Sequence, residues 1–231
     1  MVKGKRKGQG RVAHECTQKY EHADVPRISG KRLKHMLAGN DDVPGMFAVR
    51  GVLTEAECAA WIHFAKKLGM TSTRPPGGKP KRFEAYRDNS RASIQDRHAA
   101  RALWECGLGV VLRDVLEPME DGRRAATLND NIRLYCYSQG QRFGKHYDEH
   151  AHDSRGLRTE FTVLIYLSTC EGGATVFYDR LGDREVARMR PTAGMCLIHR
   201  HGDACLLHEA EPVTGDSPKW VLRTDIVYEK P

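Results

Sequence analysis

Residues 161–178 read FTVLIYLSTCEGGATVFY, and this stretch decides the fold class. It holds two short apolar runs, Phe161 to Leu167 and Ala174 to Tyr178, which are rich in the β-branched and aromatic residues that strands favour. Polar residues and two glycines separate the runs. The stretch therefore predicts two short strands, with Gly172 and Gly173 as a bulge or tight turn between them.

Short strands of the same kind continue on both sides of this stretch, from residue 129 onward. Gly, Pro and Asp separate the further predicted strands, which are Asn131 to Tyr137, Glu185 to Met189, Met195 to His199, Ala204 to Leu207 and Trp220 to Tyr228. Evenly spaced short strands are typical of a sandwich or barrel rather than of βαβ units. We therefore predict a β domain over residues 129–231.

The residues before this domain carry helical patterns. Thr54 begins a capping box that leads into a predicted helix over Cys58 to Leu68. Asp96 caps a second predicted helix over Ala99 to Leu116, whose apolar residues have helical spacing. Residues 41–128 are therefore predicted to be a helical region that supports the β domain.

The first 40 residues are rich in Lys, Arg, Gly and His and lack periodic apolar residues, so packing cannot offset the entropy of ordering them. Residues 1–35 hold ten Lys or Arg and three Asp or Glu, so the whole formal excess of +7 lies there and the rest of the chain is neutral. We predict a flexible basic arm over residues 1–40. Its run from Lys3 to Lys7 is ordinary for a solvated tail, and it also resembles a nuclear-localisation or nucleic-acid-binding cluster.

Composition also bears on location. No apolar stretch approaches the ~20 residues that cross a bilayer, and the Lys-rich start has no signal-peptide core. The seven cysteines are odd in number and none belongs to a C-x-x-C pair, which favours reduced thiols. The sequence predicts an intracellular protein, cytoplasmic or nuclear, with no membrane partner. It leaves the oligomeric state open.

His146 and Asp148 form the sharpest chemical motif of the chain. Residues two apart on a strand share a face, so the imidazole and the carboxylate point the same way. His208 follows a later predicted strand, and two histidines with one carboxylate form the facial triad of non-haem Fe(II) oxygenases. An H-x-D motif alone also arises by chance as a surface pair. Lys219 and Arg223 add context, because they share a face of the last strand and offer a fixed cation for an anionic cosubstrate.

The β domain contains five short motifs in a fixed order. They are Tyr137-x-x-Gly140-Gln141 leading to His146-x-Asp148, Gly172-Gly173-Ala174-Thr175-x-Phe177, Pro191-x-x-Gly194, His208 and Lys219. In this order they resemble the catalytic domain of prolyl 4-hydroxylase-like 2-oxoglutarate- and Fe(II)-dependent dioxygenases. The resemblance covers about Arg133 to Tyr228. It implies an α+β, mainly β fold: a double-stranded β-helix, or distorted jelly roll, buttressed by N-terminal helices.

Site residues follow from the resemblance. It implies His146, Asp148 and His208 as iron ligands and Lys219 as the residue that binds the distal carboxylate of 2-oxoglutarate. It is also consistent with Arg223, one strand repeat beyond, as a binder of the cosubstrate, the substrate or a structural carboxylate. Between the two basic residues, Lys219 is preferred.

Two tyrosines and four further histidines complete the candidates. Tyr137 and Tyr166 match positions where relatives place tyrosines against the cosubstrate, although Tyr166 also fits a core aromatic residue with a satisfied hydroxyl. His199 and His201 compete with the preferred distal ligand, but their spacing to the basic residue fits the family less well. The remaining two, His150 and His152, are better interpreted as solvated loop residues.

The resemblance also implies the chemistry. The cofactors and cosubstrates are Fe(II), 2-oxoglutarate and O₂, and ascorbate is left open as a further cofactor. Oxidative decarboxylation yields succinate and CO₂, and the substrate is hydroxylated. We expect a protein or peptide side chain, prolyl or other, as the substrate, because prolyl hydroxylation is the best-known activity of the resembled group. The fold and the cofactors do not select the substrate further.

Two other functions stay open. A non-enzymatic jelly-roll binding module could use its metal structurally, although structural zinc sites normally have four ligands that are often thiolates. A nucleic-acid demethylase on the same core needs aromatic residues that stack on bases and cations that contact phosphates. Aromatic residues make up only 7% of the chain, while the basic arm keeps nucleic acid open as a partner.

Overall fold

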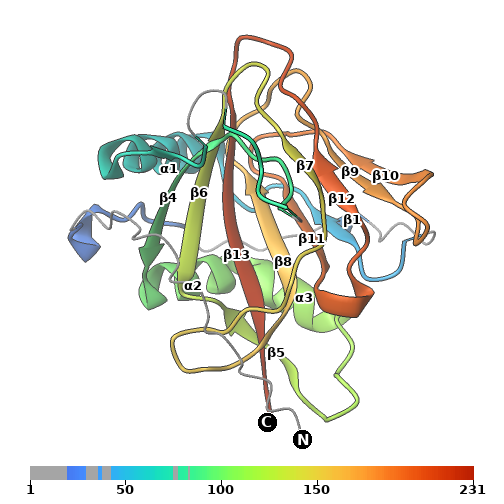
Figure 1. The fold of residues 1–231 in the computed structure, drawn as a ribbon. Coiled ribbons are helices and arrows are strands. Elements are labelled where there is room, and N and C mark those ends of the chain that lie inside the picture. The colour runs from blue at the N-terminus through green and yellow to red at the C-terminus, as the bar shows by residue number, and fades with distance from the viewer. Residues whose placement is uncertain (1–19, 30–35, 38–42, 75–77, 83) are drawn as a thin grey trace, which may run out of the picture.

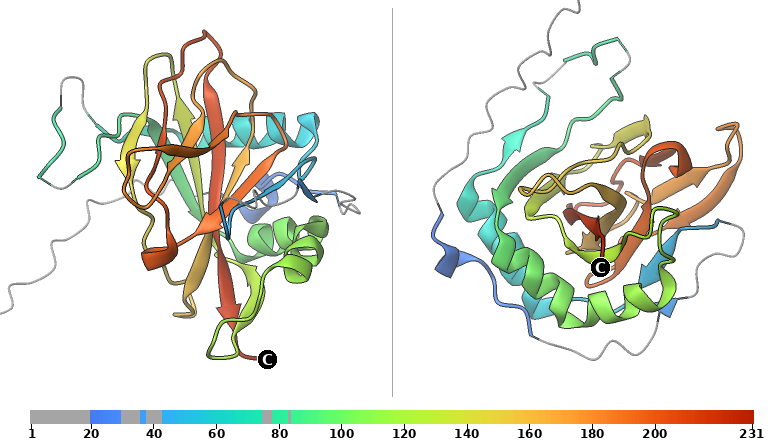
Figure 2. Two further views of the ribbon diagram at one scale, coloured as in Figure 1. Left: turned by 90° about the vertical axis from the view of Figure 1, so that its right-hand side faces the viewer. Right: turned by 90° about the horizontal axis from the view of Figure 1, so that it is seen from below.

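The computed structural model describes residues 20–29, 36–37, 43–74, 78–82 and 84–231. These residues form two β-sheets that face each other, and helices cover the outside of the larger sheet (Figure 1, Figure 2). This arrangement is a jelly roll with supporting helices, so the predicted fold class is confirmed.

The larger sheet has nine strands, and its longest strand, β13, pairs with three others. Its order is β1 (Met36–Leu37), β2 (Phe47–Val49), β11 (Cys196–Arg200), β8 (Thr159–Tyr166), β13 (Lys219–Glu229), β6 (Asn131–Tyr137), β4 (Ser90–Gln95) and β3 (Thr71–Ser72), with β5 (Arg124–Leu128) also paired to β13. Strands from the predicted supporting region thus join the sheet of the predicted β domain.

The smaller sheet has four strands. Its order is β10 (Glu185–Met189), β9 (Thr175–Tyr178), β12 (His208–Ala210) and β7 (Phe143–His146). The central strand β12 is antiparallel to both of its neighbours. The pairing of β12 with β7 joins His208 to His146, two residues that are far apart in the chain.

The first predicted helix is present as α1 (Glu55–Leu68). Its capping box is complete: the Glu57 backbone N–H donates to the Thr54 hydroxyl at 3.2 Å, and the Thr54 backbone N–H donates to the Glu57 carboxylate at 2.7 Å. Gly69 follows the last helical residue with a φ of 79°. The local sequence therefore sets both ends of this helix.

The second predicted helix is interrupted. Asp96 caps α2 (Arg97–Leu103) by accepting a hydrogen bond from the Ala99 N–H at 2.8 Å. A π-helical turn, η2 (Trp104–Leu108), then precedes α3 (Gly109–Val115). The prediction of one continuous helix is wrong here because Gly107 within η2 has a non-helical φ of 115°.

Side chains alternate along β13, so its two faces pack into two different hydrophobic cores. Trp220 and Leu222 pack with the helices in the first core, while Val221 belongs to the second core, between the two sheets. Lys219 and Arg223 lie on the same face of β13 as Val221, and both line a pocket between the sheets. Lys219 and Arg223 thus face the same pocket as residues of β7 and β12.

One predicted strand is wrong. Residues Ala204 to Leu207 are not a strand: Gly202–Ala204 form a 3₁₀ turn, and the strand begins only at His208. Gly202 has a φ of +60°, which lies outside the strand region. Apolar content alone therefore misplaced the strand by several residues.

Most of the predicted arm, residues 1–40, lies outside the described residues. Its described part includes Tyr20, whose hydroxyl donates to the Gln95 carbonyl oxygen at 3.0 Å, and Ser29, whose backbone N–H donates to the Glu57 carboxylate at 2.8 Å. Residues 20–29 thus contact the start of both helical segments. Among the helices that the structure describes, none has the length and apolar character to cross a membrane.

Gly194 provides a stability prediction. Its φ is +78°, and a Cβ at this position would lie 2.2 Å from the Leu53 carbonyl oxygen. We expect Gly194→Ala to lower the free energy of unfolding by about 2–6 kcal/mol, because a left-handed backbone and overpacking each cost ~1–3 kcal/mol. Gly51→Ala is the matched control, since Gly51 has a φ of +70° but open space around its Cβ. Equal losses for both variants in urea unfolding would contradict the expectation.

Candidate metal centre and cosubstrate pocket

The structure brings His146, Asp148 and His208 together. His146 ends β7 and pairs across the small sheet with His208, the first residue of β12. Asp148 follows β7 on the same side as His146. One ligand atom from each residue lies within 4.8 Å of the others. The sequence motif and the distant histidine thus form one cluster.

Both histidines present the same ring nitrogen to this cluster. The Nδ1 atom lies 2.8 Å from the Gly144 carbonyl oxygen in His146 and 2.9 Å from the Leu206 carbonyl oxygen in His208. A carbonyl only accepts hydrogen bonds, so each Nδ1 carries the proton and each Nε2 keeps its lone pair. These Nε2 atoms lie 3.8 and 3.7 Å from the carboxylate oxygens of Asp148.

The protonation states suit a cation. Burial lowers the pKa of His146 to about 3 and also lowers the pKa of His208, so both rings are neutral at physiological pH. Burial alone would raise the pKa of Asp148, but the Arg223 guanidinium holds it well below its usual range. Two neutral imidazoles and one ionised carboxylate are the donor set that a divalent ion binds. The residues therefore fit Fe(II).

Further contacts fix the orientation of the cluster. The Thr162 hydroxyl donates to Asp148 Oδ2 at 2.7 Å, and Arg223 Nη1 lies 3.0 Å from Asp148 Oδ1. The ring of Phe143 stacks on His146 with centroids 3.6 Å apart. Such outer contacts hold ligands in place before a metal arrives.

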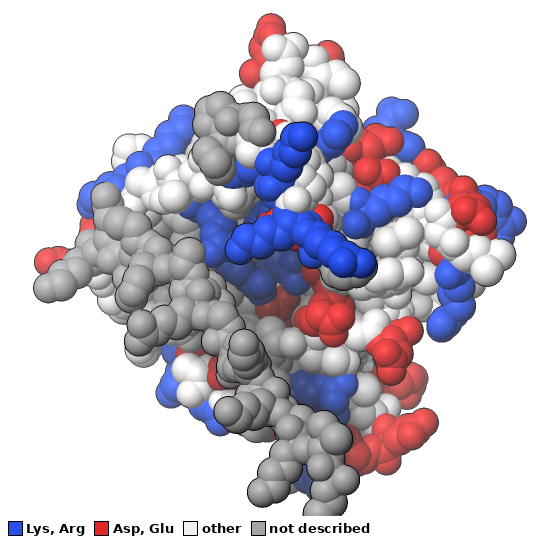
Figure 3. Space-filling model, viewed as in Figure 1, with Lys and Arg blue, Asp and Glu red and all other residues white. Residues whose placement is uncertain are grey.

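A pocket leads from this cluster into the space between the sheets. Its lining includes Tyr135, Tyr137, Leu164, Thr175, Lys219, Val221 and Arg223, together with the three clustered residues. On this face of the molecule, Lys and Arg side chains gather around a hollow (Figure 3). The pocket thus joins the clustered residues to two cations, buried Lys219 and partly buried Arg223.

Lys219 lies in the apolar part of this pocket. It is 2% exposed, and its Nζ donates to the Gly173 carbonyl oxygen at 2.6 Å. The rings of Tyr137 and Tyr166 lie 5.4 and 5.6 Å from Nζ. Within the described part of the chain, no carboxylate forms an ion pair with this amine. Lys219 is therefore a buried cation without an anionic partner, which a carboxylate ligand would supply.

The two predicted tyrosines differ in position. Tyr137 lines the pocket and pairs with Lys219 across β6 and β13. Tyr166 is fully buried behind it, and its hydroxyl shares a hydrogen bond of 2.8 Å with the Thr175 hydroxyl. The alternative interpretation of Tyr166 as a core residue with a satisfied hydroxyl therefore agrees with these contacts.

Arg223 differs from Lys219 in its partners. Besides Asp148, its guanidinium approaches Asp225, with Nε 3.6 Å from Oδ1. Asp225 is fully buried, and Arg133 also donates to it. Arg223 is thus already held by two carboxylates.

Tyr135 is a pocket residue that the sequence interpretation missed. Burial would raise its pKa, but the positive charges of Arg87, Arg133 and Arg223 lower it to about 8. The guanidinium carbon of Arg87 lies 4.4 Å from the Tyr135 ring centroid. Alternation along β6 could have found this residue, because it lies two positions from Tyr137.

The other histidines separate into two groups. His199 Nε2 lies 3.5 Å from Asp148 Oδ2, so this residue borders the cluster. His201 lies behind it, where its Nε2 is 2.7 Å from the Thr162 hydroxyl. His150 Nδ1 instead lies 2.9 Å from the Thr159 carbonyl oxygen, and His152 pairs with Arg158 in an isolated bridge.

Comparisons with known proteins agree with this geometry. Residues 132–224 match the family model of the 2OG-Fe(II) oxygenase superfamily. The matched segment is less than half of the chain and includes the three clustered residues. The match, together with this cluster, indicates an oxidoreductase that uses Fe(II), 2-oxoglutarate and O₂. A search of curated proteins gave no match.

Solved structures of prolyl hydroxylases share the fold. The viral collagen prolyl hydroxylase of Paramecium Bursaria Chlorella virus-1, in complex with 2OG, has a TM-score of 0.56 and 19% identity, over 80% of this chain and 97% of that chain. A Pseudomonas putida prolyl-4-hydroxylase has a TM-score of 0.52 and 17% identity, over 81% and 96%. A Trichoplax adhaerens prolyl hydroxylase, in complex with a hypoxia inducible factor peptide fragment, has a TM-score of 0.55 and 17% identity, over 79% of this chain and 83% of that chain.

Proposed function

We propose that this protein hydroxylates a protein or peptide side chain, prolyl or other, with release of succinate and CO₂. His146, Asp148 and His208 hold the iron in this proposal, and Lys219 binds the distal carboxylate of 2-oxoglutarate. The observation that carries it is the single pocket that joins a neutral-imidazole and carboxylate cluster to a buried, unpaired lysine. The catalytic domain is residues 129–231, supported by residues 41–128.

The chain's own residues position the reactants. Lys219 and Tyr137 bind the cosubstrate at the closed end of the pocket, and Arg223 holds the Asp148 carboxylate toward the metal. The apolar walls, including Leu164 and Val221, exclude water from the reacting atoms. When bound, Fe(II) with 2-oxoglutarate and O₂ supplies the oxidising power for hydroxylation.

Several observations support a peptide substrate. The fold is shared with prolyl hydroxylases, one of which was solved with a peptide fragment. Tyr147, between two proposed ligands, is 52% exposed and lines a second, open pocket with Arg180 and Leu207. An exposed aromatic side chain beside the proposed ligands offers a contact for an extended peptide. No disulfide joins the cysteines that the structure describes, which supports an intracellular location.

A coupled-turnover assay tests the proposal. Fe(II) and 2-oxoglutarate are bound anaerobically, oxygen is admitted, and succinate is measured with proline-containing peptide pools or with single-stranded nucleic acid. We expect peptides to stimulate succinate release and to gain one oxygen atom by mass spectrometry. Stimulation by nucleic acid alone would support the demethylase alternative, and the absence of 2-oxoglutarate binding would support the binding module.

Lys219 also predicts a pH dependence of cosubstrate binding. Burial lowers its pKa to about 8, so the free protein carries this cation below pH 8 and loses it above. We expect the dissociation constant of 2-oxoglutarate to rise about tenfold per pH unit above pH 8. Lys219→Arg is the control, because a guanidinium keeps its charge over this range. Equal pH profiles for the wild type and this variant would contradict the expectation.

A further inference from the structure

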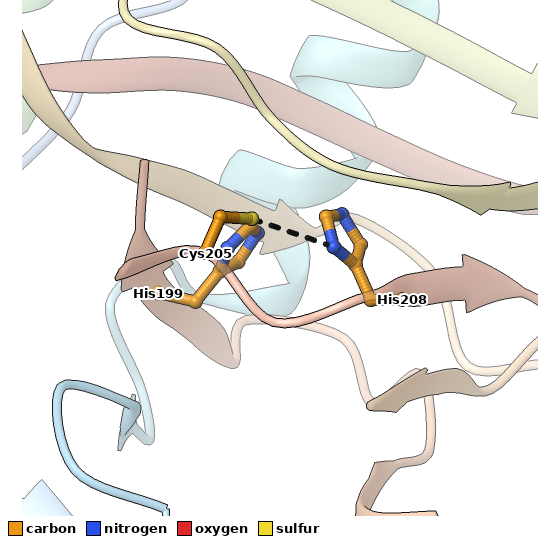
Figure 4. A group of neighbouring side chains, drawn as sticks. All are labelled: His199, Cys205 and His208. Carbon is orange, nitrogen blue, oxygen red and sulfur yellow. Dashed lines mark hydrogen bonds between the residues drawn. The ribbon is translucent and has the colours of Figure 1, made fainter. Parts of the chain in front are cut away.

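A second group of ligand atoms lies beside the proposed iron site. His199 on β11, Cys205 after the 3₁₀ turn and His208 on β12 each offer one ligand atom within 4.8 Å of the others. Their side chains point toward one another from three separate segments (Figure 4). All three residues are buried, with 3%, 6% and 3% exposure.

His199 leaves a buried nitrogen without a partner. Its Nε2 is inaccessible and makes no hydrogen bond, although Asp148 Oδ2 lies 3.5 Å away. Its Nδ1 lies 3.3 Å from the Arg200 carbonyl oxygen, which favours a proton on Nδ1 and a lone pair on Nε2. Buried polar atoms without partners are rare in folded proteins, and a buried nitrogen with a lone pair is suited to bind a metal ion.

The sulfur of Cys205 is a thiol that donates to the Leu206 carbonyl oxygen at 3.4 Å and lies beside the two histidines. The Asp148 backbone N–H donates to Sγ at 3.2 Å, and Sγ lies 3.8 Å from His208 Nδ1. A hydrogen bond from a backbone N–H stabilises negative charge on sulfur. Metal-ligand sulfur atoms in proteins are thiolates that receive such outer contacts.

We propose that His199, Cys205 and His208 form a second metal site, which takes a soft divalent ion such as Zn²⁺ and is alternative to the iron site. Two imidazoles and a thiolate suit zinc, whereas two imidazoles and a carboxylate suit Fe(II). Binding replaces the thiol proton, which is released to solvent, and forms the metal–sulfur bond without any redox change.

The two sites exclude each other because they share His208. Its Nδ1 is held by the Leu206 carbonyl oxygen at 2.9 Å, so only Nε2 offers a lone pair, and one lone pair binds one metal ion. Zinc at the second site therefore removes a ligand from the iron site. This inhibitory consequence rests on the proposed function, whereas zinc binding itself does not.

Cobalt spectroscopy of the metal-free full chain tests the site without an activity readout. Co²⁺ replaces Zn²⁺ as the probe, since a cobalt–thiolate bond gives an intense near-ultraviolet absorption. We expect this band in the wild type and in His146→Ala, which lacks an iron ligand only. We expect the band to be lost in Cys205→Ser. We expect Cys136→Ser to keep it, because Cys136 lies on the face of β6 that packs against the helix-side core, away from the pocket. A wild type without the band, or a Cys205→Ser variant that retains it, overturns the site.

A second measurement addresses the exclusion. Zinc is titrated into the Fe(II)-loaded enzyme, and succinate release is referred to the uninhibited rate of each variant. We expect the half-inhibiting zinc concentration to rise at least tenfold in Cys205→Ser relative to Cys136→Ser. An unchanged value means that zinc only replaces iron and overturns the exclusion. A cobalt–thiolate band in a protein that never produces succinate would overturn the proposed function and leave the second site intact.

Discussion

Asp148→Ala is expected to weaken Fe(II) binding about 10²–10⁴-fold and to abolish succinate release at ordinary iron concentrations. Asp148 supplies the only negative charge in the proposed triad, and Arg223 Nη1 lies 3.0 Å from it. Without the carboxylate, this guanidinium, whose side chain is 12% exposed, repels the incoming cation. Removing one partner of a buried ion pair costs about 3–5 kcal/mol, which corresponds to the stated range of affinity.

Anaerobic calorimetry of Fe(II) binding checks this expectation, and succinate release gives an independent readout. Glu149→Ala is the matched control, because Glu149 is the adjacent acidic residue and is exposed. A circular dichroism spectrum shows whether each variant is folded. If Asp148→Ala binds Fe(II) as the wild type does, another residue completes the site, and His199 is the nearest candidate.

Local sequence predicted the elements that local forces determine. Strand β6 has the predicted bounds Asn131–Tyr137. Its side chains alternate between the core beside the helices and the core between the sheets, and this local pattern can be read from the sequence. The capping box fixed the start of α1 for a similar reason. The strand β12 was misplaced because its three residues are defined by pairing with β7 and β9, which no local pattern encodes.

The site could be predicted as a set of residues but not as a set of contacts. Spacing and family resemblance indicated His146, Asp148 and His208, which the structure brings together. The contact between Arg223 and Asp148 joins residues far apart in the chain, and it depends on how β13 faces β7 across the interior. His199, on β11, was predicted as a competing ligand, and it does lie beside the cluster. Its unpartnered Nε2 could not be predicted, because it depends on which residues pack around it.

Lys219→Met is expected to raise the dissociation constant of 2-oxoglutarate about 30- to 5,000-fold while it leaves Fe(II) affinity within a few-fold. Methionine keeps a long side chain over the Tyr137 and Tyr166 rings but removes the cation. A ligand carboxylate would then be buried without a partner, and losing one partner of such a pair costs about 2–5 kcal/mol. Anaerobic calorimetry with iron-loaded protein measures both constants.

Arg223→Met separates the two basic residues. Arg223 contacts Asp148 and Asp225, so its removal should weaken Fe(II) binding more than it weakens 2-oxoglutarate binding. The contacts of the Lys219 amine with described residues are a carbonyl oxygen and two rings, so the opposite pattern is expected for its variant. The two substitutions each remove one positive charge and introduce the same side chain. A difference between their effects on Fe(II) and 2-oxoglutarate affinity therefore reports where each cation lies. If Arg223→Met instead shows the larger loss of 2-oxoglutarate affinity, the guanidinium binds the cosubstrate carboxylate and the assignment to Lys219 is wrong.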